Sequence, residues 1–235
     1  MKAPERAALP LGLAATLGRT YGRLTETVQG LSDADFERET RCAGMPVGPL
    51  LVHLLYDAQR ALIAFASPAT ADPDRDFVTY WQDFPARTKG DPEPDTSFVR
   101  GVAAAYRKPG VLVQHWREVS EAAVRAAAVG LADKTRRVET QGHVLRAKDF
   151  VATLVLEATV HHLDLVVGFP DAPEPDPEGL QVVARTLDGL FGPEAWDEIG
   201  WDTTTYVLKA TGRIPLDEDD LDMLGPHADR LPLLA

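Results

Sequence analysis

Apolar side chains recur at helical spacing in several long segments of the chain. In residues 11–31 they fall every third or fourth position, so they share one face of a helix. The segment 97–129 contains Pro109 and Gly110, which predict a break in its helix, because proline removes a helical hydrogen bond. The same spacing predicts further helices over 47–66, 97–129, 177–191 and 201–210.

One segment differs from the others because it is apolar on nearly every side. Residues 149–167 contain no glycine or proline and are too long for a strand, so they predict a buried helix. Within it, Glu157 and His161 are four residues apart and lie one turn apart on one face. Such a pair can bind one metal ion. In the alternative, which is more common for a pair taken alone, Glu157 meets an arginine or lysine and the histidines are hydrogen-bonded core residues.

The segments between these helices contain turn and loop residues. Residues 67–96 are dense in proline and aspartate and predict a loop. Its aromatic residues indicate that it folds back on the body, and we expect it to plug the end of the helices rather than to cover a ligand. Residues 133–146 predict an extended crossover with a short strand, and 171–177 an acidic, proline-rich linker. The aromatic residues of the loop are Phe77, Tyr80, Trp81 and Phe84.

Composition narrows the class of protein further. The chain has 235 residues, of which 45% are hydrophobic and 26% charged, as is typical of a soluble globular protein. Its net charge of -12 disfavours nucleic acid and anionic membrane surfaces as partners. Cys42 is the single cysteine, which excludes an intramolecular disulfide and makes a reducing cytoplasm the simplest expectation. We find no stretch with the length of a transmembrane span.

Three short motifs carry a resemblance to a known family. The first is the loop 42–47, which leads into a helix containing His53; the second is 157–165, with the Glu157/His161 pair followed by Asp-Leu; the third is the Thr-Gly-Arg ending at Arg213. Together they resemble the DinB-like superfamily and, within it, the mycothiol-dependent maleylpyruvate isomerase family. The first motif departs from the family pattern at Met45, where the family normally has tryptophan.

The resemblance implies an all-α fold, a DinB-like four-helix bundle of up-down type with a long crossover. The bundle would span residues 1–170, and residues 171–235 would form a helical extension packed on it. The implied metal ligands are His53, Glu157 and His161. Two nitrogens and one carboxylate oxygen suit Zn²⁺ with an open position, and they would also accept Ni²⁺, Co²⁺ or Fe²⁺.

The implied activity uses a small thiol, mycothiol or a similar molecule, as cofactor or co-substrate. A metal-bound thiol is deprotonated, so it could attack a small electrophile in S-transfer or in cis-trans isomerisation. Arg213 is our candidate catalytic residue, as an anchor for a substrate carboxylate, with Lys209 and Arg60 as substitutes, although a solvated surface role is the more common one for each. His162 is expected to be a packing residue, and Asp164 either supports a ligand histidine or has a capping or surface role.

Two other function classes remain open at this stage. The chain could be a binding or regulatory bundle that kept the fold and the metal without catalysis, or a metal-free structural protein. Hydrolase motifs such as G-x-S-x-G and H-E-x-x-H are absent, as is a phosphate-binding P-loop. The sequence does not identify the substrate, and maleylpyruvate itself is a poor candidate because the family is broad. The sequence is compatible with either a monomer or a homodimer.

Overall fold

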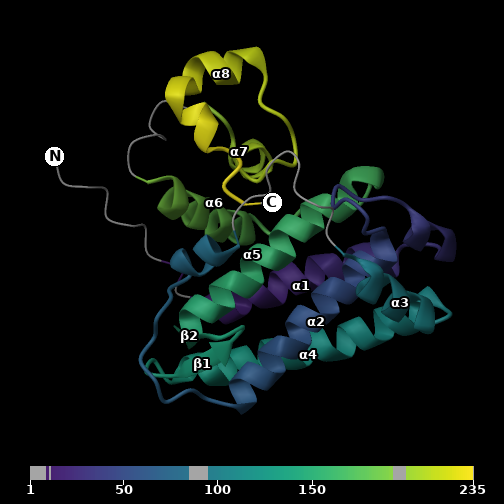
Figure 1. The fold of residues 1–235 in the computed structure, drawn as a ribbon. Coiled ribbons are helices and arrows are strands. Elements are labelled where there is room, and N and C mark those ends of the chain that lie inside the picture. Colours follow the sequence, from purple (N-terminus) through teal and green to yellow (C-terminus); the bar gives the residue numbers. More distant parts are fainter. Residues whose placement is uncertain (1–8, 11, 85–94, 193–199, 235) are drawn as a thin grey trace.

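Four long helices form the body of the protein, as the computed structural model shows (Figure 1). The structure describes residues 9–10, 12–84, 95–192 and 200–234. The predicted all-α bundle is confirmed. Its helices are α1 (Leu13–Gln29), α2 (Val47–Ala66), α4 (Pro109–Ala132) and α5 (Ala147–Leu165).

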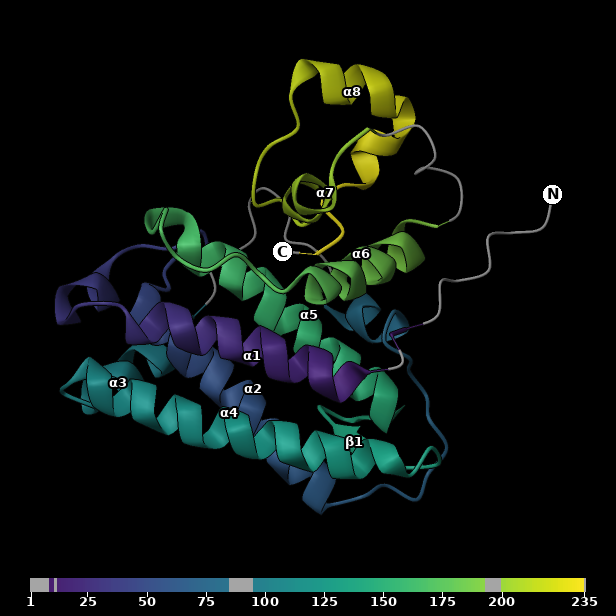
Figure 2. The ribbon, with the colours of Figure 1, turned by 180° about the vertical axis from the view of Figure 1, so that it is seen from behind.

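The helices run in two directions. Both α2 and α4 end near a small hairpin, where Pro68 bridges to Val138, and α5 begins directly after that hairpin. Late residues of α1 lie beside late residues of α5, since Thr27 Oγ1 is 3.1 Å from His162 Nε2. Thus α1 and α5 run one way and α2 and α4 the other (Figure 2). The long crossover between α2 and α4 is confirmed, and it makes these two helices parallel.

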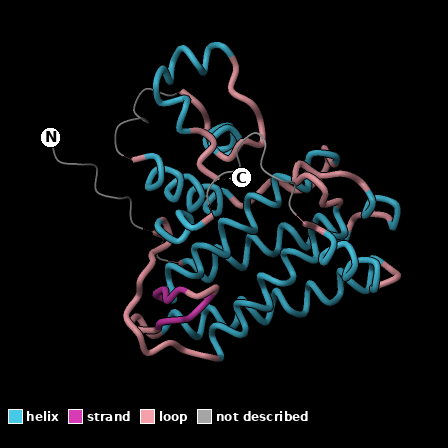
Figure 3. The backbone as a smooth tube through the Cα atoms, in the orientation of Figure 1, coloured by secondary structure: helices cyan, strands magenta, loops and turns pink. Residues whose placement is uncertain are grey.

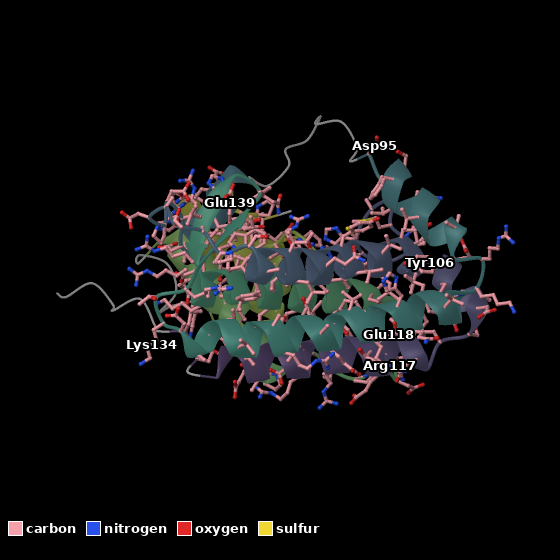
Figure 4. The ribbon with its side chains drawn as sticks, turned by 90° about the horizontal axis from the view of Figure 1, so that it is seen from below. Asp95, Tyr106, Arg117, Glu118, Lys134 and Glu139 are labelled. Atoms are coloured by element: carbon pink, nitrogen blue, oxygen red, sulfur yellow. The ribbon has the colours of Figure 1, made fainter. Side chains whose placement is uncertain are left out.

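The core lies where the apolar faces of the four helices meet. Leu17, Leu51, Trp116 and Val155, one from each long helix, are fully buried. Opposite faces are polar, and Figure 4 shows Arg117 and Glu118 on the outer side of α4. Helix α5 is buried on nearly every side because α1, α2 and α6 (Pro177–Phe191) all pack against it.

The expectation that no stretch has the length of a transmembrane span is wrong for α5. Residues Ala147–Gly168 do have the length and hydropathy of a membrane span, with a mean hydropathy of 1.5. In the structure 83% of this window is buried inside the fold. Its apolar side chains are therefore covered by neighbouring helices, and length and composition alone are weak grounds for a span.

The predicted extended crossover is a two-stranded antiparallel hairpin, β1 (Arg137–Thr140) and β2 (His143–Arg146) (Figure 3). Its turn is made by Gln141 and Gly142, both with positive φ, which is the geometry that tight hairpin turns need. The predicted break before Pro109 is confirmed and separates α3 (Ser97–Ala105) from α4. Short 3₁₀ helices lie at Asp33–Glu37, Thr79–Asp83, Val166–Gly168 and Gly225–Arg230.

Beyond the bundle, the chain adds α6, α7 (Thr203–Ala210) and α8 (Glu218–Leu224), and Figure 1 shows them stacked above α5. Each begins at an aspartate whose carboxylate accepts a hydrogen bond from a backbone N–H of the first turn. Helix α6 contacts α5 and α1, and α7 contacts α6. The turn after α7 carries Arg213 back towards the C-terminal end of α5, where it pairs with Asp164.

Candidate metal centre and its cavity

Three predicted ligand side chains meet between α2 and α5. Their donor atoms all lie within 4.8 Å of one another, although His53 and Glu157 are 104 residues apart in the chain. Glu157 Oε2 is 3.1 Å from His161 Nε2 and 3.5 Å from His53 Nε2. The helical spacing of Glu157 and His161 puts both on the face of α5 that looks at α2, where His53 stands on the flank of the apolar stripe.

His161 and Glu157 each stabilise the charged form of the other. Burial alone would lower the pKa of His161, but hydrogen bonds to Asp164 and Glu157 raise it to about 9. Burial would raise the pKa of Glu157, yet hydrogen bonds from His161 and His53 hold it well below its usual range. Without a metal, protonated His161 and ionised Glu157 therefore form an ion pair, and the proton on Nε2 lies where a metal ion would bind.

Behind the cluster, a buried carboxylate fixes the orientation of His161. Asp164 Oδ2 is 2.9 Å from His161 Nδ1, so Nε2 is left to face Glu157. Asp164 is completely buried, and Arg213 holds it with Nε and Nη2, each at 3.2 Å. Burial opposes ionisation, but His161 and Arg213 keep the pKa of Asp164 below its usual value. A carboxylate behind a histidine is the usual support for a metal ligand.

A second carboxylate supplies a test of whether a metal fits here. Asp57, four residues after His53 on α2, has its Oδ2 3.5 Å from His53 Nε2. That oxygen is buried and has no hydrogen-bond partner among the described residues. Burial and the charge of Glu157 raise the pKa of Asp57 to about 6. A cation beside His53 would compensate this orphaned oxygen, so the cluster fits a divalent metal in both donor type and charge.

The cluster opens into a cavity of about 760 Å³. Trp81 and Phe84 line it, which confirms that the aromatic loop folds back on the body and adds a cavity wall to its expected role at the bundle end. They come from a loop remote in sequence, which periodicity within one segment cannot place. The other lining residues away from the metal cluster are Arg41, Cys42, Ala43, Met45, Leu156, Val160, Thr211, Gly212, Arg213, Pro232 and Leu234.

Comparison with known proteins identifies the family. A family model described as "Mycothiol maleylpyruvate isomerase N-terminal domain" matches residues 17–166. The chain belongs to this family. The match confirms the resemblance carried by the sequence motifs, and it contains His53, Glu157 and His161, whereas Arg213 lies beyond it.

Two crystal structures are also similar to the chain, one of the mycothiol-dependent maleylpyruvate isomerase and one of a histidine-to-alanine mutant of it. Each is 19% identical, and each alignment covers 76% of this chain and 68% of the other. The TM-scores are 0.48 and 0.46. No curated protein matches the chain.

Two further histidines of the bundle, His162 on α5 and His115 on α4, lie away from the cavity. His162 is fully buried and lies 3.1 Å from Thr27 Oγ1, in agreement with a packing role. Burial lowers its pKa to about 4. His115 is 2.7 Å from the hydroxyl of Tyr106, on the face of α4 towards α3. Neither histidine lines the cavity.

The substitutes considered for Arg213 have other partners. Lys209 is held by Asp217 and Asp220 on the loop and first turn of α8. Arg60 lies 4.0 Å from Asp57. Neither side chain is among those lining the cavity. Arg213 does line it, with its guanidinium engaged by Asp164 and by the carbonyl of Thr211.

Sequence reasoning missed three residues at the centre. Asp57 could have been found, because it lies one helical turn after His53 on the same face. Arg41 and Cys42 lie in a loop, where no periodicity indicates direction. Burial raises the pKa of the Cys42 thiol to about 11, so this cysteine is protonated at neutral pH although it lines the cavity.

Proposed function

We propose that this chain is a metal-dependent enzyme that uses mycothiol, or a similar small thiol, to isomerise or S-conjugate a small electrophile. The observation that carries the proposal is the meeting of His53, Glu157 and His161 at the wall of a cavity of about 760 Å³. Membership of the maleylpyruvate isomerase family supports the use of a thiol. The size of the cavity is within the range of small-molecule sites.

His53, Glu157 and His161 would hold the metal. Two imidazole nitrogens and one carboxylate oxygen suit Zn²⁺, with Ni²⁺ as the second candidate. When bound, such an ion supplies a Lewis acid with an open position at which a thiol loses its proton near neutral pH. The set contains no protein sulfur ligand, although Cys42 Sγ lies within 4.8 Å of ligand atoms of His161 and Asp164.

The chain's own residues would prepare the site. Asp164 accepts a hydrogen bond from the Nδ1–H of His161, which leaves Nε2 to bind the metal. Arg213 neutralises Asp164 and links the C-terminal extension to the metal centre. Burial raises the pKa of the Cys42 thiol to about 11, which makes Cys42 a poor nucleophile at neutral pH. The apolar cavity wall would exclude water from the reacting sulfur.

The experiment is turnover by the zinc-loaded protein with defined thiol and electrophile pairs. Mycothiol with maleylpyruvate tests isomerisation, and mycothiol with 1-chloro-2,4-dinitrobenzene tests S-transfer with loss of chloride. His161→Ala and Glu157→Gln should abolish thiol-dependent turnover. The matched control is His115→Ala, which removes a histidine outside the cavity and should retain it.

The outcomes separate the candidate functions. Turnover that needs the thiol, the metal and His161 supports the enzyme. Turnover that persists in His161→Ala and Glu157→Gln contradicts the proposed centre. Metal binding at the three residues without turnover of either pair would favour the binding or regulatory bundle instead.

A further inference from the structure

Two arginines line the cavity, and they differ in how far their donors are already used. Arg213 has all three guanidinium nitrogens engaged, with Nε and Nη2 on Asp164 and Nη1 on the carbonyl of Thr211. Among the residues that the structure describes, the guanidinium of Arg41 has one hydrogen-bond partner, the carbonyl of Leu163, which accepts from Nη1 at 2.6 Å. An arginine whose donors are occupied by a buried carboxylate has little left with which to bind a ligand anion.

The position of Arg41 is fixed by the backbone. Its N–H donates to the carbonyl of Asp164 at 3.1 Å, and its side chain caps the preceding carbonyl, so both contacts anchor it to the C-terminal end of α5. Within the part of the chain that the structure describes, no carboxylate lies within 4.0 Å of its guanidinium. The guanidinium therefore brings an uncompensated positive charge and several unused N–H donors to the cavity wall.

The rest of the cavity wall away from the metal cluster is mostly apolar. Trp81 and Phe84 come from the aromatic loop, Leu156 and Val160 from α5, and Leu234 from the C-terminal tail. These side chains offer surface to a hydrocarbon or aromatic group and no charge to a second anion. The chain as a whole carries a net charge of -12, so an anionic ligand needs a local cation to bind.

We propose that the cavity takes an electrophile with one carboxylate on an apolar body, and that Arg41 rather than Arg213 binds this carboxylate. The inference rests on the proposed function and names the substrate class of the same site. Arg41 would position the substrate, with the carboxylate at the end of α5 and the apolar body against Trp81 and Phe84. Arg213 would position His161 through Asp164 and make no contact with substrate.

Binding of an inert pair of probes tests the inference without thiol or turnover. Phenylacetate and phenylacetamide have nearly the same shape and differ in charge. Calorimetry with the zinc-loaded protein should give at least about 10-fold tighter binding of phenylacetate, the size expected for one charge-assisted hydrogen-bonded contact. Arg41→Gln should remove this preference. Arg117→Gln, the same charge change on the outer face of α4 (Figure 4), should keep it.

Each result decides the matter. Equal binding of both probes by the wild type, or an unchanged preference in Arg41→Gln, overturns the inference. A carboxylate that bound directly to the metal would give the second of these results. Failure of the proposed function is separate, because an Arg41-dependent preference without thiol turnover would refute the activity alone, and thiol turnover without that preference would refute this inference alone.

Discussion

The carboxylate of Asp164 connects the metal centre to the C-terminal extension, and Asp164→Asn tests that connection. The substitution keeps the shape of the side chain and removes its charge. In the structure Asp164 is completely buried between His161 and Arg213. The variant would leave Arg213 without its partner and would no longer favour the tautomer that frees His161 Nε2.

Two magnitudes follow from this geometry. Breaking a buried ion pair by removing one partner costs about 3 kcal/mol at the low end, and that end applies because the guanidinium of Arg213 still reaches the cavity. For a chain of this size the loss lowers the Tm by roughly 6 to 12 °C. Loss of a carboxylate that supports a ligand histidine weakens metal binding by about 10- to 100-fold.

The assay is competition for Zn²⁺ with a chromogenic chelator, together with thermal unfolding. The matched control is Asp176→Asn, since Asp176 is also a buried aspartate that binds an arginine, Arg19, at 2.8 Å, and it lies at the start of α6. Both variants should lose stability, but only Asp164→Asn should lose zinc affinity. A folded Asp164→Asn protein with wild-type zinc affinity would refute the reasoning.

Three further outcomes are expected. Burial lowers the pKa of His162 to about 4, below its unfolded value of about 6.5, so stability is complete above about pH 6.5 and falls by roughly 3 kcal/mol as the pH drops to about 4. Urea unfolding of His162→Gln should lack this part of the pH dependence, and an identical slope would contradict it. Since the pKa of His161 is about 9, Zn²⁺ binding at pH 7 should release about one proton, which an indicator titration measures. Zinc binding without proton release would contradict the ion pair of His161 and Glu157. A Cβ on Gly130 would lie 2.3 Å from Phe65, so Gly130→Ala should cost about 1–3 kcal/mol in chemical denaturation, whereas Gly22→Ala, which meets nothing within 4 Å, should not destabilise.

Local pattern was sufficient for most of the helices. The apolar spacing in 11–31 and 47–66 predicted α1 and α2, and the proline at 109 predicted the start of α4, because these signals depend only on neighbouring residues. The spacing of Glu157 and His161 predicted their common face for the same reason. Their meeting with His53 depended on the family resemblance, since no local pattern pairs α2 with α5.

Long-range contacts account for what the sequence did not indicate. The engagement of Arg213 by Asp164 joins residues 49 apart, and the approach of Trp81 and Phe84 to the cavity joins a loop to α5. The role proposed for Arg41 could not be predicted from the sequence either. It depends on which guanidinium N–H donors remain unused, and that is a property of the folded chain alone.

The central claim is that His53, Glu157 and His161 together bind one metal ion with a position open to a thiol. X-ray absorption at the zinc edge, recorded on the zinc-loaded protein before and after addition of mycothiol, tests it most directly. The account predicts two imidazole nitrogens and a carboxylate oxygen at about 2.0–2.2 Å, and a new sulfur neighbour at about 2.3 Å once the thiol is present. Zinc that gains no sulfur neighbour in saturating thiol, or that keeps the same surroundings in His161→Ala, would contradict it.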